Sequence, residues 1–208
     1  MEEPIRSCDI PQTELPAELP VMVLPDCHLF PGCLLPLFIF EERYRQMLAQ
    51  VLSSNRMFCI GNRDGTLENS PVSNYSTAGL VRCCVRQDSG TSHLLLLGLK
   101  RVRFTGWVRE KPFPIARVEP VVTKVKSAAR AQELKDRALA LFHAAGDEQA
   151  KQLRSALENK ENAEMVCDVL SYHFTRCPKL QQKLLAESSL ERRYEMLIEA
   201  LEKTKCEE

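Results

Sequence analysis

The sequence lacks an excess of charge of either sign. Lysine plus arginine and aspartate plus glutamate each number 28 in 208 residues, so the formal net charge is zero. Proteins that hold nucleic acid by bulk electrostatics carry clustered and unbalanced cations, because binding releases counterions from the phosphates. Composition therefore gives no indication of a nucleic-acid partner.

Long apolar runs are missing as well. The longest, residues 33–40, has eight residues, far fewer than the roughly 20 that a membrane helix needs. The N-terminus carries two acids, Glu2 and Glu3, and no apolar segment of the kind found in signal peptides. We expect a cytoplasmic protein that does not enter a membrane, with residues 1–18 as an extended leader.

Metal-binding cysteine pairs are absent. None of the nine cysteines stands in a C-x-x-C pair, and most lie within apolar runs, where a free thiol behaves as a small apolar side chain. The alternative is a zinc site at Cys27, His28 and Cys33, but no second ligand pair completes four-fold coordination. We expect reduced core thiols, no metal and no cofactor.

Catalytic motifs are absent too. The sequence has no phosphate-binding G-x-x-x-x-G-K-[ST] loop, no G-x-S-x-G and no H-E-x-x-H. Cys167 and His173 are six residues apart on one expected helix, a spacing that does not place them on one helical face. A small thiol hydrolase is the catalytic alternative that remains. The expectation is that the chain is not an enzyme.

What the sequence does contain begins with two apolar strands, residues 20–24 and 34–40. Pro31 and Gly32 break the chain between them, so we expect a hairpin. From Phe40 the apolar spacing becomes helical, which predicts a helix over the open end of that hairpin. Further strands are expected at residues 57–61, 78–86, 93–104 and 115–122. The four leucines at 94–97 predict burial on both faces, and Gly98 and Gly106 predict bulges.

Helical spacing replaces strand spacing after about residue 125. One helix ends at Gly146, a second runs from Asp147 to Leu157, and a third covers residues 161–176. Pro178 begins a fourth, and Ser188 with Glu191 predicts a capping box for the last. We divide the chain into a leader (1–18), a β-rich subdomain (19–125) and a helical subdomain (126–208).

Several motifs resemble one known family. The sequence LFPG is followed by PLFIFEERYRQML, and then, in order, come GLVRCCV (79–85), LLLLGLKRVRF (94–104), PFPIARVEPV (112–121) and a helical segment at 180–202. Residues 19–202 are similar to the N-terminal substrate-binding domain of Lon proteases. The resemblance implies an α+β fold: a PUA-like β-pseudo-barrel with one inserted helix, followed by an α-helical bundle. Because the ATPase and serine-lysine protease motifs of Lon are missing, we expect a stand-alone domain.

The resemblance also implies a partner, namely unfolded or extended polypeptide, and a separate protease or chaperone is a second candidate partner. A β-rich domain can bind such a chain through a sheet edge or an apolar groove. Two places are candidates for polypeptide binding. The first is the polar face of the first helix, and the second is the aromatic and proline-rich segment at 107–113. Their candidate residues are Glu42, Arg43, Gln46, Trp107 and Phe113. The oligomeric state is left open.

A second hypothesis is RNA binding, because the Lon N-terminal barrel resembles PUA-type barrels of RNA-binding proteins. One expected strand and its continuation carry a local group of cations, and alternation along a strand would place Arg101 and Arg103 on one face. The candidate residues for this alternative are Lys100, Arg101, Arg103 and Arg109.

Overall fold

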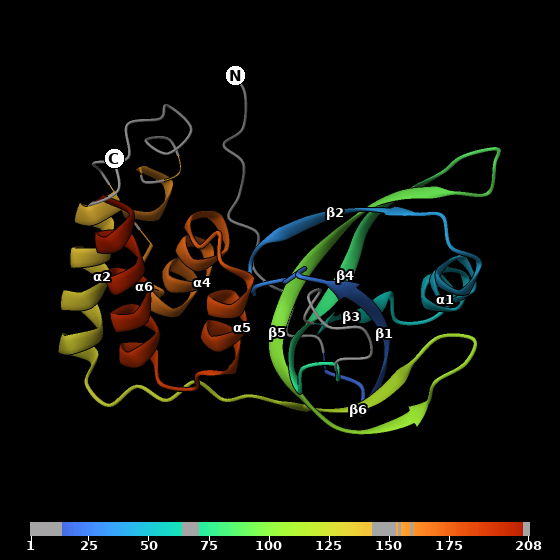
Figure 1. Ribbon diagram of the computed structural model, residues 1–208, viewed down its shortest axis with the longest axis horizontal. Coiled ribbons are helices and arrows are strands. Elements are labelled where there is room, and N and C mark those ends of the chain that lie inside the picture. Colours follow the sequence, from blue (N-terminus) through green and yellow to red (C-terminus); the bar gives the residue numbers. More distant parts are fainter. Residues whose placement is uncertain (1–13, 64–70, 143–152, 154, 159, 206–208) are drawn as a thin grey trace.

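The strands and one helix lie at one end of the molecule, and the other helices lie at the opposite end (Figure 1). The computed structural model describes residues 14–63, 71–142, 153, 155–158 and 160–205. The strands are β1 (Glu18–Pro25), β2 (Leu34–Ile39), β3 (Met57–Arg63), β4 (Tyr75–Arg86), β5 (Ser92–Arg109) and β6 (Ile115–Pro120). The helices are α1 (Glu42–Leu52), α2 (Ala128–Phe142), α4 (Ala163–Phe174), α5 (Pro178–Ala186) and α6 (Leu190–Lys205).

The strands form one six-stranded sheet in the order β2-β5-β4-β3-β1-β6, and β6 also pairs with β5. Because β6 contacts both β1 and β5, the strands β5, β4, β3, β1 and β6 form a ring. Among the strand pairs of the described residues, only β1 and β3 run parallel. The long strand β5 pairs with β2 over its first half and with β6 over its second, so β2 lies outside the ring at the end of the sheet.

The predicted hairpin between β1 and β2 is wrong. β1 pairs with β3 and β6, whereas β2 pairs with β5. The turn between them instead lies against β5: the Gly32 N–H donates to the Gly98 carbonyl and the Gly98 N–H donates to the Cys33 carbonyl, each at 2.9 Å. A Cβ at Gly98 would lie 2.0 Å from the Phe30 carbonyl oxygen, so only glycine admits this close backbone approach.

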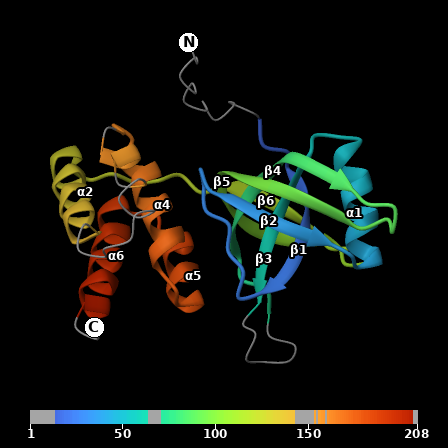
Figure 2. The ribbon, with the colours of Figure 1, turned by 90° about the horizontal axis from the view of Figure 1, so that it is seen from above.

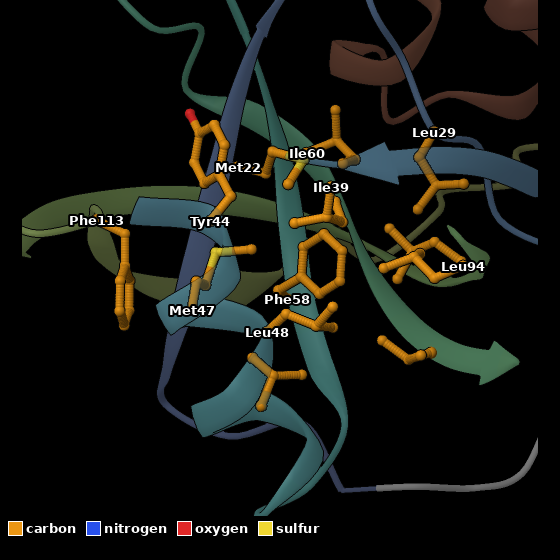
Figure 3. Close-up of a cluster of buried hydrophobic side chains, with 13 residues drawn as sticks. Met22, Leu29, Ile39, Tyr44, Met47, Leu48, Phe58, Ile60, Leu94 and Phe113 are labelled. Carbon is orange, nitrogen blue, oxygen red and sulfur yellow. The ribbon is translucent and has the colours of Figure 1, made fainter. Parts of the chain in front are cut away.

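α1 covers one side of the sheet, where its apolar face meets the strands (Figure 3). Tyr44, Met47 and Leu48 are buried against side chains such as Phe58 from β3 and Leu94 from β5. The Tyr44 hydroxyl also donates to the Val23 carbonyl at 3.0 Å. Intervening residues of the same strands build a second core with β6, which includes Val21, Cys59, Val102 and Val118.

The helical end has its own core, formed mainly by α2, α4 and α6. The predicted cap of α6 is displaced by one residue. Ser189, not Ser188, accepts from the Arg192 N–H with its side chain (3.3 Å), and its carbonyl accepts from the Arg193 N–H (3.0 Å). The Glu191 carboxylate accepts from the backbone N–H groups of Lys126 and Ser127 at 2.6 and 2.9 Å, which ties the start of α2 to α6.

The turn before β2 joins the two ends (Figure 2). Phe30 and Cys33 are buried against Leu184 and Leu185 of α5. The Tyr172 hydroxyl of α4 donates to the Leu34 carbonyl at 3.2 Å. The residues around position 30 therefore hold the helices against the sheet.

Some expectations fall outside the part of the chain that the structure describes. These are the leader up to residue 13, the helix end at Gly146 and the helix start at Asp147. None of the helices within the described ranges combines the length and the apolar character that crossing a bilayer requires.

Candidate functional site

Large apolar side chains lie exposed on one side of β2, β5 and β4. We call this surface the outer β-face. Phe38 is central, with ring centroids 4.7 Å from His93 and 5.8 Å from Phe40. The exposed fractions of the apolar members range from 38% for Leu95 to 60% for Phe40. The outer β-face consists of Leu34, Phe38, Phe40, Val85, His93 and Leu95.

Strand register makes this surface continuous. Phe38 pairs with His93, which pairs with Val85 across β5 and β4. In the next row, Pro36 pairs with Leu95, which pairs with Cys83. Directly opposed side chains have Cβ atoms about 4.5–5.5 Å apart, so each row is in contact.

The outer β-face is unusual because β2 is apolar on both sides. Leu35 and Leu37 point into the core beneath α1, whereas Leu34 and Phe38 point away from it. Strands that are apolar on both faces are normally covered on both. No described element covers this side, so an apolar surface faces solvent.

The free edge of β2 is only partly available for strand pairing. No strand in the described ranges pairs with β2 on the side away from β5. Pro36 has no N–H to donate, and the Leu34 carbonyl already accepts from Tyr172. Prolines on edge strands oppose pairing with another chain, so side chains rather than backbone groups are the main feature of this site.

The candidate binding face of α1 is exposed, but its polar side chains already bond to one another. The Gln46 amide donates to Glu42 at 3.1 Å, and Arg43 donates to Glu41 at 2.8 Å. Glu42 also forms an ion pair with Arg45 at 3.2 Å. Contact with a partner would have to replace these bonds.

In the candidate site at residues 107–113, one of the two aromatic side chains is exposed and the other is buried. Trp107 is 41% exposed and lies against Phe104 at 5.5 Å between ring centroids. Phe113 is 2% exposed and belongs to the core under α1, so its assignment to a binding surface is wrong. The reason is its position between two prolines in the connection to β6, which turns its ring inward below the Arg109 guanidinium.

The four cations proposed for RNA binding do not form one surface. Arg101 is buried, with its guanidinium donating to both oxygens of Asp168 at 2.6 and 2.5 Å, so its expected role on a surface is wrong. Arg103 is exposed but paired with Glu119 at 2.9 Å. Lys100 and Arg109 are exposed at separate positions on β5. A cluster of paired and buried cations is a poor phosphate site.

Arg101 instead belongs to a buried ion network between sheet and helices. Asp168 of α4 also accepts from Arg193 of α6 at 3.0 Å, and Arg193 reaches Glu164 at 3.3 Å. Burial raises the pKa of Asp168, and the two guanidinium groups oppose that shift. A cavity of about 330 Å³ borders the network and is lined by residues including Lys100, Val122 and Met165. Its paired charges indicate a structural role.

The proposed zinc ligands do not converge. Cys27 lies against the core under α1, whereas Cys33 is buried with Phe30 against α5. Among the residues that the structure describes, no three His, Cys, Asp or Glu side chains form a group suited to a metal. Burial raises the pKa of Cys33 and Cys167 to about 12. Such thiols are protonated and weakly nucleophilic, which argues against the thiol-hydrolase alternative.

Sequence reasoning missed the outer β-face. Leu95 was expected to be buried, yet it is 38% exposed. Periodicity could not reveal the site, because an all-apolar strand gives the same pattern whether one or two of its faces are covered. The available signal was the apolar edge strand itself, which carries a proline and no charge.

The fold is similar to solved Lon N-terminal domains. One is the N-terminal domain of a Mycobacterium avium complex Lon protease, with a TM-score of 0.72 and 16% identity, covering 89% of this chain and 98% of that one. Another is a Lon N-terminal domain protein from Xanthomonas campestris, with a TM-score of 0.63 and 19% identity, covering 87% and 96%.

Relatives found by sequence similarity are Lon proteases as well. A Lon protease of Desulfosudis oleivorans is 28% identical over 48% of this chain and 13% of its own length. A Lon protease of Roseiflexus castenholzii is 24% identical over 98% of this chain and 26% of its own length. The chain thus spans about a quarter or less of these relatives. The family described as "ATP-dependent protease La (LON) substrate-binding domain" matches residues 18–203. The chain belongs to the Lon substrate-binding domain family.

Proposed function

We propose that the chain is a non-catalytic recognition module that binds unfolded or extended polypeptide through the outer β-face. The observation that carries the proposal is the continuous exposed apolar surface on β2, β5 and β4, centred on Phe38. Contiguous apolar surface on a soluble domain marks a contact site, because leaving it in water is unfavourable.

The shape of the surface suits an extended chain. Phe38, His93 and Val85 lie in a row across three strands, and Pro36, Leu95 and Cys83 form the adjacent row. An extended polypeptide places alternate side chains on one side about 7 Å apart, and could contact both rows with its apolar residues. Burying one leucine or phenylalanine of the partner contributes about 1.5–3 kcal/mol.

Three finer statements belong to this proposal. The module acts as an accessory to protein quality control, delivering bound polypeptide to a separate protease or chaperone. It works in the cytoplasm, where reducing conditions suit the free and buried thiols of Cys33, Cys59 and Cys167. Its strand ring is related to PUA-like barrels in architecture, without the RNA-binding role.

The test is binding of a fluorescent, permanently unfolded polypeptide, followed by anisotropy. Substituting Phe38→Ser and Leu95→Ser together should weaken binding at least tenfold, since two exposed apolar contacts are removed without touching the core. The matched control is Trp107→Ser with Val108→Ser, which removes exposed apolar area at the β5–β6 hairpin.

Circular dichroism must show that both variants are folded. Equal affinity of the Phe38/Leu95 variant and the unchanged protein would refute the outer β-face as the site. A loss confined to the Trp107/Val108 variant would move the site to residues 107–113. A loss on substituting Glu42, Arg43 and Gln46 instead would move it to α1.

A further inference from the structure

The free edge of β2 carries backbone groups that point away from the sheet. In an antiparallel pair, the N–H and C=O groups of successive residues point alternately toward the neighbouring strand and away from it. The Cys33 carbonyl accepts from an N–H of β5 at 2.9 Å, whereas the Leu34 carbonyl accepts from the Tyr172 hydroxyl on the other side. Alternation from Leu34 therefore directs the backbone groups of Pro36 and Phe38 away from β5.

Three of these backbone groups can accept or donate a hydrogen bond to a further strand: the N–H and C=O of Phe38 and the C=O of Pro36. No residue in the described ranges is bonded to them from the free side. Edge strands are usually protected by charged side chains, bulges or prolines. β2 has no charged residue, and its one proline removes the donor at a single position. The edge at Phe38 is therefore unprotected.

Apolar side chains lie beside this edge on both faces of the sheet. On the outer β-face, Phe38 is the first member of the row that continues through His93 and Val85. On the opposite face, Leu35 and Leu37 pack against the core under α1 but are only half-buried. A strand added about 4.8 Å from β2 would cover both sets of side chains and bond to the backbone between them. Amide groups at this spacing are what another polypeptide supplies.

We infer that the bound polypeptide pairs with β2 as an additional strand, so that the module selects extended apolar segments without proline where they meet Phe38. The inference rests on the proposed function and specifies its substrate class. The segment accepts one hydrogen bond from the Phe38 N–H and donates to the carbonyls of Phe38 and Pro36. Its alternate side chains extend the outer β-face. Because every chain has these backbone groups, segments of many sequences can bind, and the apolar neighbours favour apolar ones.

The experiment measures binding of fluorescent peptides with one sequence, Thr-Leu-Val-Phe-Val-Leu-Thr, in each of which one backbone nitrogen is methylated. An added strand turns the N–H groups of alternate residues toward β2 and the others toward solvent. Methylation at one set of alternate positions should weaken binding about tenfold, because a donor is lost and the methyl group obstructs the approach to β2. Methylation at the intervening positions is the matched control and should change the affinity by less than about twofold.

Substitutions in β2 test the same bonds from the side of the protein. Phe38→Pro and Phe38→Ala both remove the ring, but only the first removes the N–H, so it should bind the unmethylated peptide about fivefold more weakly than the second. That N–H points away from β5, so its loss breaks no bond within the sheet. Pro36→Val adds a donor to the free edge and should strengthen binding about fivefold. Circular dichroism checks that each variant is folded.

An alternating effect of methylation, together with weaker binding by Phe38→Pro than by Phe38→Ala, supports strand pairing at β2. Methylation that acts equally at all positions, or at none, overturns the inference but leaves polypeptide binding through side chains intact. Failure of every peptide to bind, the unmethylated one included, refutes the proposed function and the inference with it. Equal affinities of the two Phe38 variants overturn the role of this edge. Sedimentation of the free protein as a dimer that the peptide does not dissociate would assign the edge to a second copy of the chain and also overturn the inference.

Discussion

His28 is a buried imidazole at the turn that joins the sheet to α5. Its side chain is 5% exposed, and burial lowers its pKa below the ordinary value of 6.5, opposed by Gln182, Gln181 and Asp26. The folded protein therefore holds His28 neutral, whereas the unfolded chain takes up a proton near pH 6.5. Protonation at this position favours unfolding.

We predict that the free energy of unfolding falls as the pH drops below about 6.5, at most by about 1.4 kcal/mol per pH unit from this residue. Above that pH the contribution of His28 is complete, because both states are neutral. Urea titrations at several pH values between 5 and 7.5 measure the slope, and His28→Gln should flatten it. The control is His173→Gln: burial lowers the pKa of His173 too, but its side chain is exposed, so its share should be smaller. A slope unchanged by His28→Gln would contradict the prediction.

Single residues also show where sequence reasoning ends. The positions of α4 and α6 were predicted to within a few residues, because the helical spacing of apolar residues identifies a helix without knowledge of its partner. The role of Arg101 was not predictable, because its partner Asp168 is 67 positions away. A cation on a strand looks the same in sequence whether it meets water or a buried carboxylate. Pairing of that kind is a property of the tertiary structure.

At the scale of elements, two glycines on β5 differ in the space that a side chain would have. Gly98 lies under the Phe30 carbonyl, whereas a Cβ at Gly106 would have no atom within 4 Å. Both glycines lie directly beside register shifts, where bulges were predicted. Only one of them, however, requires the absence of a side chain.

Gly98→Ala should destabilise the protein by at least about 2 kcal/mol, because the backbone of the turn must move and lose its bonds to β5. Gly106→Ala should change stability by less than about 1 kcal/mol in either direction. Urea unfolding of the two variants measures both values. Similar losses in the two would show that the glycines act through bulge geometry and not through the contact with Phe30.

The elements themselves were largely predictable, but their pairing was not. Strand positions follow from apolar runs bounded by breakers, and β3, β4 and β6 begin within three residues of the predicted positions. The pairing of β1 with β3 instead of β2 depends on the contact of the Phe30–Cys33 turn with β5 and α5. The sequence LFPG signals a reversal but does not specify the surface against which it packs.

At the scale of the whole molecule, the sheet and the helices are joined by buried charge as well as by apolar contact. Asp168 of α4 binds Arg101 of β5 and Arg193 of α6, and all three are at most 3% exposed. Removing one partner from a buried ion pair costs about 3–5 kcal/mol, since the remaining charges lose their compensation. This dependence should make the two ends unfold together.

Two probes can test this cooperativity, because each reports on one end. Trp107, the single tryptophan, lies on β5, while the circular dichroism of helices comes mainly from α2, α4, α5 and α6. We predict that both signals change at the same urea concentration, as in a two-state transition. Asp168→Asn should lower both midpoints together, whereas Glu119→Gln, which breaks the exposed pair with Arg103, should shift them by the equivalent of less than about 1 kcal/mol. Two separate midpoints in the unchanged protein would show that sheet and helices are independent units, and the buried network would then have no part in holding them together.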